Sequence, residues 1–364
     1  MMNSMAQTSK VNLVSSAVPF LRIAPDARGG GMGDLGVASS PDVNSLYYNM
    51  AKYPFAENKS SLSVNYSPWL KSLGFNDIYL AGMAGYHKLD EGQVLYGSIR
   101  YFSIGNLQFT DNSGNELSTF KPNEFSVEGG YSRKLAANLS LGVGIRYIYS
   151  NLAGGQSING VNYKAGTAIS GDVGLFYTTT PTQETGWNFG MALTNLGSKI
   201  GYTSDMTRRS YIPTNLALGL NYMATLQEVH RVSFGIDLRK MLVPTPPAME
   251  DSVGWEKYMS GSVVNSWFSS WSDAPGGFNE EMEEFGISLG AEYVYNNMFS
   301  IRGGYSYESP SKGNRQYLTL GTGFNYSSYG FNFSYLVPTG SGINRSPLSN
   351  TLRFSFLLNL QGKK

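Results

Sequence analysis

Short and long gaps alternate between strand-like segments from residue 61 to the C-terminus, and this rhythm constrains the fold more than any other feature. The even-numbered gaps hold only a few residues, such as Ala136-Ala137, whereas the odd-numbered gaps are mostly longer. An even strand count with tight turns at one end and long loops at the other is typical of an outer-membrane β-barrel. We therefore predict an all-β, 14-stranded antiparallel transmembrane barrel in the outer membrane. Its strands are expected at residues 61–68, 77–87, 93–103, 124–133, 138–149, 167–179, 186–195, 213–224, 231–240, 284–296, 298–308, 315–326, 330–337 and 350–360.

The strand-like segments alternate apolar and polar residues. In 138–150, Leu141, Val143 and Ile145 alternate with small or polar residues, and the same period of two recurs in 350–360. Side chains at this period point to opposite faces of a strand, so one face suits lipid and the other a polar lumen. A soluble β-sandwich also alternates, but its outward face would be polar and its loops would not segregate by length. The pattern therefore favours the membrane barrel.

The composition supports a barrel and excludes several classes of protein. The 364 residues include 43 Gly, 25 Tyr and 19 Phe, and only 15% are charged. Aromatic side chains are enriched where a barrel meets the membrane–water interfaces. The formal net charge of +1 gives no basic field for nucleic acid. The absence of cysteine excludes disulfides and thiolate metal sites.

The first 60 residues differ from the rest, and we divide the chain into an extension at 1–60 and the barrel at 61–364. The segment 18–40 is irregular and rich in Gly and Pro. Irregular backbone at membrane depth is tolerated only inside protein or in a wet cavity. We therefore expect this extension to plug the barrel lumen.

Two further expectations concern the extension. Residues 42–56 read as a short helix that begins near Ser40 or Pro41. Residues 1–11 lack the basic and apolar regions of a secretion signal, so we expect that a signal peptide has been removed.

A glycine-rich string, Gly31-Met32-Gly33-Asp34-Leu35-Gly36, matches the G-x-G-x-x-G pattern of dinucleotide sites. Pro25 precedes it and Ser39-Ser40-Pro41 follows, so the required strand and helix are missing. We interpret the glycines as allowing tight turns in a crowded lumen. The expected plug contacts are Arg22, Asp26, Arg28, Gly29, Gly30, Gly31 and Gly33.

Charged residues also fall at strand positions that alternation directs into the lumen. A charge facing lipid would cost several kcal/mol, so an inward direction is expected. Because both signs are present, we favour a self-neutralising network that grips the plug over a selectivity ring for a solute. The predicted network comprises Glu128, Arg146, Asp172, Asp237, Arg239, Glu292, Arg302 and Arg353.

No pattern of catalytic or metal-binding residues stands out. The two histidines, His87 and His230, are isolated at strand ends, and no carboxylate cluster lies at ligand spacing. No Gly-x-Ser-x-Gly elbow or acid–base pair is evident. We predict a protein that is not an enzyme and needs no cofactor or metal.

The ninth gap, at about 241–283, carries the strongest functional signal. It holds three of the five tryptophans and ends in an acidic run. Tyr258, Val263, Trp267 and Trp271 are spaced for one face of a short helix. The loop is either a lid that buries its own aromatic residues over the barrel mouth or an exposed surface for docking a protein. The candidate partner-binding residues are Trp255, Tyr258, Trp267, Phe268 and Trp271.

Two N-terminal blocks carry a resemblance to a known family. Ala17 to Ala38 and the following Asn44 to Ala51 resemble the N-terminal signature of the PorV family, outer-membrane proteins of the Bacteroidetes type IX secretion system. The likeness extends over the whole chain, although the last strand ends in Leu360-Gln-Gly-Lys-Lys and not in a terminal aromatic residue.

The resemblance implies a barrel of the FadL-like superfamily that has been turned to protein export. Such proteins are expected to bind the C-terminal signal domain of secreted cargo as it leaves a giant outer-membrane translocon barrel. They then deliver it to an attachment complex with a sortase-like protease, which joins cargo to lipopolysaccharide. Loop 241–283, helped by 104–123 and 196–212, would present the aromatic residues to cargo.

Two other functions remain open from the sequence. A plugged barrel also suits a FadL-like transporter of hydrophobic small molecules, which Pro213 and the Gly-rich strands leave possible. A purely structural outer-membrane protein would explain the barrel but would leave the Trp-rich loop without a task.

Overall fold

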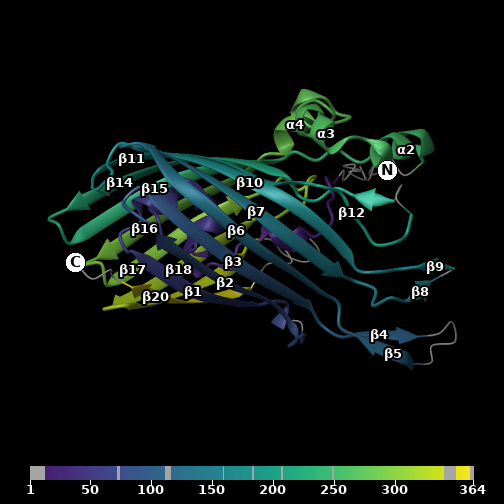
Figure 1. Ribbon diagram of the computed structural model, residues 1–364, viewed down its shortest axis with the longest axis horizontal. Coiled ribbons are helices and arrows are strands. Elements are labelled where there is room, and N and C mark those ends of the chain that lie inside the picture. The colour runs from purple at the N-terminus through teal and green to yellow at the C-terminus, as the bar shows by residue number, and fades with distance from the viewer. Residues whose placement is uncertain are drawn as a thin grey trace, which may run out of the picture.

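Fourteen antiparallel strands form one closed barrel in the computed structural model (Figure 1). The structure describes residues 13–71, 74–110, 116–158, 160–182, 184–205, 208–247, 250–339 and 350–360. Each barrel strand pairs with the next along the chain, and β20 pairs with β1 to close the ring. The strands are β1 (Ser60–Pro68), β2 (Ile78–Lys88), β3 (Gln93–Ile104), β6 (Asn123–Ala136), β7 (Leu139–Asn151), β10 (Gly166–Thr178), β11 (Gly186–Gly197), β14 (Asn215–Leu226), β15 (His230–Met241), β16 (Gly286–Tyr295), β17 (Phe299–Tyr307), β18 (Tyr317–Tyr326), β19 (Tyr329–Pro338) and β20 (Leu352–Leu360).

The predicted fourteen strands and their alternating gaps are confirmed, with small shifts at the strand ends. At the short-turn end, Asn296 and Asn297 both adopt positive φ, at 51° and 53°. Paired left-handed residues give the turn that matches the twist of two antiparallel strands. The opposite end carries the long loops, three of which form small hairpins: β4 (Leu107–Thr110) with β5 (Glu116–Phe120), β8 (Ser157–Ile158) with β9 (Val161–Asn162), and β12 (Ile200–Gly201) with β13 (Arg209–Ser210).

The two faces of the wall differ as the alternation predicts. On β7, Val143, Ile145 and Tyr147 point outward and are exposed, whereas Arg146 and Ser150 point inward and are buried. An apolar outer surface suits hydrocarbon, and the closed ring leaves no unpaired strand edge within it. Among the residues that the structure describes, no helix is both long and apolar enough to cross a membrane.

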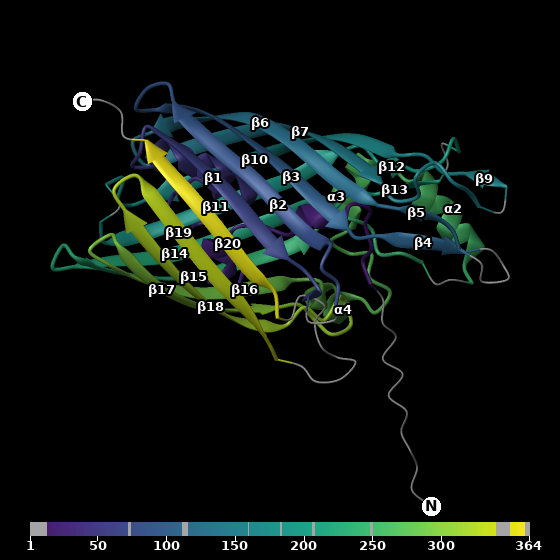
Figure 2. The same ribbon diagram turned by 90° about the horizontal axis from the view of Figure 1, so that it is seen from below.

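Residues 18–56, which we call the luminal segment, run through the barrel interior (Figures 1 and 2). The segment enters at the long-loop end, where the Ala17 amide donates to the Tyr211 carbonyl, and leaves at the short-turn end before β1. It is almost entirely buried and contacts strands on opposite sides of the ring. Its helical turns are short: η1 (Pro19–Arg22), α1 (Ala27–Gly30), η2 (Ser45–Tyr47) and η3 (Met50–Phe55).

The single helix predicted for residues 42–56 is wrong. The chain forms the two 3₁₀ turns η2 and η3, separated by Asn49, which is extended and accepts a hydrogen bond from the Ala51 amide. Pro54 lies inside η3 and lacks the amide that a longer helix would need. Contacts with the barrel wall, and not the hydrogen bonds of one continuous helix, therefore stabilise this segment.

Residues 242–285, which we call the rim excursion, connect β15 to β16 at the long-loop end. The excursion contains α2 (Ser252–Ser260), α3 (Val263–Ser269) and α4 (Phe278–Glu283). Figure 1 shows α3 and α4 outside the wall beside the long-loop end, with α2 farther from the barrel. The excursion thus extends the wall outward and does not enter the lumen.

We expect Ile145→Arg to lower the free energy of unfolding by about 2–4 kcal/mol, the cost of a cationic side chain near the bilayer midplane. Ile145 lies mid-strand on β7 and is 64% exposed on the outer face. Urea titration of the protein folded into lipid vesicles would measure the change, with Ile145→Leu as the control. A barrel as stable with Arg as with Leu at this position would contradict a lipid-facing wall.

Candidate functional site

A cluster of buried charges joins the luminal segment to β16 and β17. The Arg28 guanidinium donates to both carboxylate oxygens of Glu292, at 2.9 and 2.7 Å. Glu292 also accepts from Arg302 Nε at 2.7 Å, and Arg28 Nη1 reaches Asp42 Oδ2 at 2.9 Å. A buried carboxylate shared by two guanidinium groups is a strong, geometrically specific contact. Removing it would leave two buried cations without that partner.

A second cluster surrounds Asp34, at a sharp bend of the luminal segment. Asp34 adopts φ 62° and its carboxylate is bound by the Arg353 guanidinium and the Tyr317 hydroxyl. The Arg239 guanidinium donates to the Asp34 carbonyl oxygen. The bend is therefore held by side chains from β15, β18 and β20, on well-separated parts of the sequence.

Asp237 on β15 holds the backbone that follows this bend. Its Oδ2 accepts from the amides of Gly36 and Val37, at 2.7 and 3.0 Å. From the other side, Lys52 Nζ donates to the Gly36 carbonyl at 2.6 Å and to Ser39 Oγ at 3.1 Å. An irregular segment lacks its own ladder of hydrogen bonds, so these charged groups satisfy its buried amides and carbonyls.

The third cluster belongs to the wall itself. Arg146 Nη2 lies 2.7 Å from Glu128 Oε2 and 2.6 Å from Asp172 Oδ2, which joins β6, β7 and β10. Asp172 also accepts from the Asn195 amide at 2.6 Å, and Arg146 donates to the Asn195 side chain. The structure therefore places the eight predicted inward charges in mixed-sign pairs, whereas Arg100 binds the Leu21 carbonyl and Glu124 the Ser150 hydroxyl.

Glycines allow the luminal segment to approach its neighbours closely. A Cβ on Gly29 would lie 2.2 Å from the Tyr48 hydroxyl, and one on Gly30 would lie 2.6 Å from Arg353 Nη1. A Cβ on Gly31 would lie 3.0 Å from the Gly321 Cα, and Gly33 has φ 72°. The G-x-G-x-x-G string therefore lies packed against the wall, with no strand before it and no helix after it to hold a phosphate.

The remaining expected plug residues, Asp26 and Arg22, lie in the N-terminal part of the luminal segment. Asp26 caps α1 by accepting from the amides of Arg28 and Gly29, at 3.0 and 2.7 Å. Arg22 Nη2 lies 2.9 Å from Glu308, which also binds Arg315 at 2.6 and 2.7 Å.

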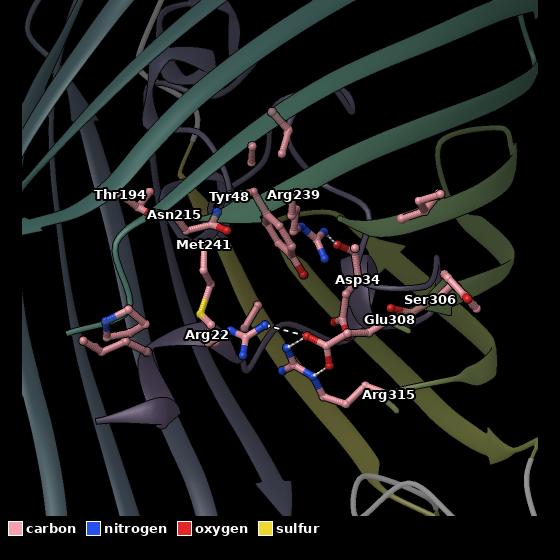
Figure 3. Close-up of a pocket in the computed structure, with 18 of the residues that line it drawn as sticks. Arg22, Asp34, Tyr48, Thr194, Asn215, Arg239, Met241, Ser306, Glu308 and Arg315 are labelled. Atoms are coloured by element: carbon pink, nitrogen blue, oxygen red, sulfur yellow. Dashed lines mark hydrogen bonds and ion pairs between the residues drawn. The ribbon is translucent and has the colours of Figure 1, made fainter. Parts of the chain in front are cut away.

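The Arg22–Glu308–Arg315 cluster lines a cavity of about 130 Å³ on the long-loop side of the luminal segment, which we call the upper cavity (Figure 3). The cavity holds charged side chains of both signs, including Asp34, Arg239, Lys312 and Arg315, beside apolar groups such as Met241. A second cavity of about 140 Å³ lies at the short-turn end. The luminal segment lies between the two, because Arg28 lines this second, lower cavity and Asp34 lines the upper one.

The five aromatic residues predicted to bind a partner do not form one surface. Trp255 and Tyr258 lie on α2 with their rings 5.4 Å apart, and Tyr258 stacks edge-on against Tyr211 at 5.3 Å. Burial raises the pKa of the Tyr258 hydroxyl to about 12. Phe268 and Trp271 are exposed on or just after α3, whereas the Trp267 indole nitrogen is buried.

The predicted helical face through Tyr258, Val263, Trp267 and Trp271 is wrong. Tyr258 belongs to α2, which ends at Ser260, and Trp271 lies beyond the end of α3 at Ser269. Gly261 accounts for the break, because it adopts φ −55° and ψ 142°, an extended conformation in which the helix cannot continue. The excursion therefore presents its aromatic residues in two groups.

Two lysines anchor the excursion, and the sequence reasoning missed both. Lys240 Nζ lies 3.0 Å from Glu281 and 2.6 Å from Glu284, while Lys312 Nζ lies 2.6 Å from Glu280 and 3.2 Å from Glu284. For Lys240 the sequence did contain a signal. Because Asp237 and Arg239 point inward, Lys240 must point outward on the same strand.

The acidic cluster of the excursion is neutralised by these lysines. Carboxylate oxygens of Asp273, Glu281 and Glu284 lie within 4.8 Å of one another. Burial, and then the Glu284 and Glu281 carboxylates, raise the pKa of Asp273, although hydrogen bonds from Thr245 oppose the shift. Because lysine ammonium groups bind Glu281 and Glu284 and Thr245 donates to Asp273, we interpret the cluster as an anchor and not as a metal site.

Comparisons with known proteins agree with this architecture. The family model described as Type IX secretion system protein PorV matches residues 5–248. No curated protein matches the sequence. Two structures of the Pseudomonas putida toluene transporter TodX superpose with TM-scores of 0.50 and 0.51 at 12% and 14% identity, covering 92% and 90% of this chain and 100% and 95% of theirs. A Pseudomonas aeruginosa FadL homologue has a TM-score of 0.45 at 11% identity, covering 92% of this chain and 98% of its own. At these identities the likeness shows the fold alone.

We expect Gly304→Ala to loosen the luminal segment. The new methyl would lie 2.2 Å from the Met32 carbonyl carbon and 2.3 Å from the Gly33 amide nitrogen, which are backbone atoms that must move away. Hydrogen exchange of the amides of residues 32–37 should accelerate, while barrel amides stay protected. Gly129→Ala is the matched control, since nothing lies within 4 Å of its Cβ. Equal exchange in both variants would show that the close contact does not hold the segment.

Glu292→Ala should lower the free energy of unfolding by about 3–5 kcal/mol, because it leaves buried guanidinium groups without their shared carboxylate. Glu57→Ala removes an exposed carboxylate 3.8 Å from Arg231, and its cost should be at most about 1 kcal/mol. Urea unfolding in lipid vesicles would compare the two variants. A small loss for Glu292→Ala would mean that the cluster contributes little to holding the segment.

Proposed function

Because the chain belongs to the PorV family of type IX secretion system proteins, we propose that it is a non-enzymatic outer-membrane component that receives secreted cargo at its extracellular rim. In this proposal it binds the C-terminal signal domain of cargo leaving a giant translocon barrel. It then delivers the cargo to a sortase-like attachment complex, and lipopolysaccharide is the final acceptor. Catalysis belongs to that complex and not to this chain.

The filled lumen is the observation that carries the proposal. The luminal segment is tied to β15, β16 and β20 by buried charges and to β18 by the Tyr317 hydroxyl, and the two cavities described at its ends measure about 130 and 140 Å³. A folded protein domain is far larger than these cavities. Cargo handled by this protein must therefore bind outside the lumen, on the loops or on the outer wall.

The outer end of the rim excursion offers a preorganised surface for such cargo. Lys199 Nζ donates to the Met259 carbonyl at 2.8 Å, and the Tyr211 hydroxyl donates to the Gly261 carbonyl at 3.2 Å, so the end of α2 is fixed to the rim. Val253 is exposed on α2 beside Trp255. Fixed aromatic side chains lose little entropy on binding, which favours them as anchors for a protein partner.

A second function is supported by the upper cavity. Together with the likeness to a toluene transporter, a cavity between the luminal segment and the wall suits passage of a small hydrophobic molecule. Its lining counts against this alternative, since an apolar ligand would have to displace water from Arg22, Glu308 and Arg315. Cargo binding therefore accounts for more of the structure.

Pull-down of the tagged protein from native outer membranes in mild detergent separates the two functions. Recovery of secreted proteins with a shared C-terminal domain, together with a giant barrel or a sortase-like protease, supports the cargo proposal. Recovery of the barrel alone with a fatty acid or hydrocarbon in its lumen would support transport of small molecules.

Deletion of residues 250–275 should abolish recovery of cargo and leave a folded barrel. The cut removes α2 and α3 but keeps Glu281 and Glu284, which pair with Lys240. Heat-modifiable migration on a gel checks that the barrel is folded. Shortening the β8–β9 hairpin, on the same end of the barrel, is the control. Unchanged cargo recovery after the deletion would remove the excursion from the mechanism.

A further inference from the structure

Helix α3 has its polarity reversed relative to a helix that packs on a water-soluble core. Ser266 and Ser270, four residues apart, are buried at 2% and 0% exposure. Val264 and Phe268, four residues apart on the opposite side of α3, are exposed, and so is Trp271, two residues past the end of the helix. A helix in water turns its apolar stripe inward, so an outward stripe indicates an apolar environment on that side.

Helix α4 presents the same kind of surface. Phe278 is 77% exposed and Met282, four residues later on the same face, is also exposed. Glu281 of the same helix is buried and binds Lys240 at 3.0 Å. Helix α4 therefore holds the barrel through the buried Glu281, and both short helices leave apolar side chains uncovered.

The exposed stripe is continuous with the lipid-facing wall. Lys240 follows Phe234 and Leu238 on the outward face of β15, yet its side chain is only 1% exposed because the excursion covers it. Phe285 precedes Ile287 on the outward face of β16, and the Trp271 ring packs against it at 6.3 Å. The excursion thus lies on the outside of the wall, as Figure 1 shows for α3 and α4.

The excursion also fills a gap in the aromatic belt at the long-loop end. Over β1, β2 and β3 this belt is Tyr66, Tyr79 and Tyr101, with ring centroids 5.6 and 6.1 Å apart. Over β6 and β7 it continues through Phe125 and Tyr147, 6.2 Å apart. Aromatic side chains at this level mark the membrane–water interface.

The wall of β14, β15 and β16 has no aromatic side chain at the corresponding outward positions. Leu216, Leu238, Lys240 and Ile287 stand there instead. Trp271 of the excursion lies over this part of the wall, with its ring 5.8 Å from the Lys240 ammonium group and 6.3 Å from the Phe285 ring.

We propose that the stripe of Val264, Phe268, Trp271, Phe278 and Met282 is an interfacial membrane contact, inserted among the acyl chains and head groups of the outer leaflet. Continuity with the lipid-facing rows of β15 and β16 selects lipid as the occupant. The buried pairs of Lys240 with Glu281 and Glu284 attach the excursion to the outer end of β15, at the level of the aromatic belt. This inference goes beyond cargo binding and does not rest on it.

Site-directed spin labelling tests the proposal in the intact barrel. The chain contains no cysteine, so Phe268→Cys and Phe278→Cys each create a single attachment point for a nitroxide. Phe234→Cys, 59% exposed on the outer face of β15, is the lipid control, and Val253→Cys, 75% exposed on α2, is the aqueous control. The proteins are placed in vesicles of phosphatidylcholine and phosphatidylglycerol, and collision rates with oxygen and with a water-soluble nickel chelate are measured. A heat-modifiable gel shift confirms folding of each variant.

We expect labels at 268 and 278 to collide with the nickel chelate several-fold less than the label at 253, and with oxygen nearly as often as the label at 234. Nickel collision rates equal to those at 253 would place the stripe in water and overturn the proposal. If those rates then fell on addition of solubilised outer-membrane proteins, the stripe would be a protein-docking surface. Low collision rates with both reagents would mean that the stripe is covered by protein, which would also overturn it.

Discussion

Every backbone amide and carbonyl at membrane depth must find a partner within the protein, and the rest of this structure depends on that requirement. Pairing of β20 with β1 satisfies the wall completely and leaves no edge. Closure then creates a polar interior that must be filled or left wet. The irregular segment 18–56 fills it, and because it forms no strand ladder, its own amides and carbonyls require side-chain partners such as Asp237 and Lys52.

The inward-pointing charged side chains supply these partners for the luminal segment. Single-sign charges would repel one another in a confined lumen and would attract counter-ions, whereas Glu292 between Arg28 and Arg302 neutralises both sides of one contact. Strand glycines also help to hold the luminal segment, because Gly304 lets the wall backbone approach the Met32 backbone directly. The lumen is therefore an interior held by specific contacts. For this reason we propose that partners bind on the loops and the outer surface.

Alternation along the chain was sufficient to predict the strands, their number and the inward direction of residues such as Arg146 and Glu292. The pairing of Arg28 with Glu292 could not be predicted, since the two residues are 264 positions apart and only barrel closure brings them together. The helix predicted at 42–56 failed because contacts with the wall outweigh local helix preference, and the aromatic residues of the excursion failed to share a face because Gly261 ends α2. Local patterns thus predicted the wall, and long-range contacts determine what it encloses.

Lys240 shows how the same alternation carries more information than the strand positions. Lys240 stands at an outward position near the end of β15 and is nevertheless buried, so a neighbouring segment covers it and must supply partners for its ammonium group. The rim excursion supplies that cover through Glu281, Glu284 and the Trp271 ring, 5.8 Å from the ammonium group. Because α3 and α4 cover the outside of the wall, we propose that their outer faces contact lipid. The surfaces left for a protein partner in water are then α2 and the long-loop hairpins. The two proposals, cargo recognition and membrane contact, therefore concern different helices of one excursion.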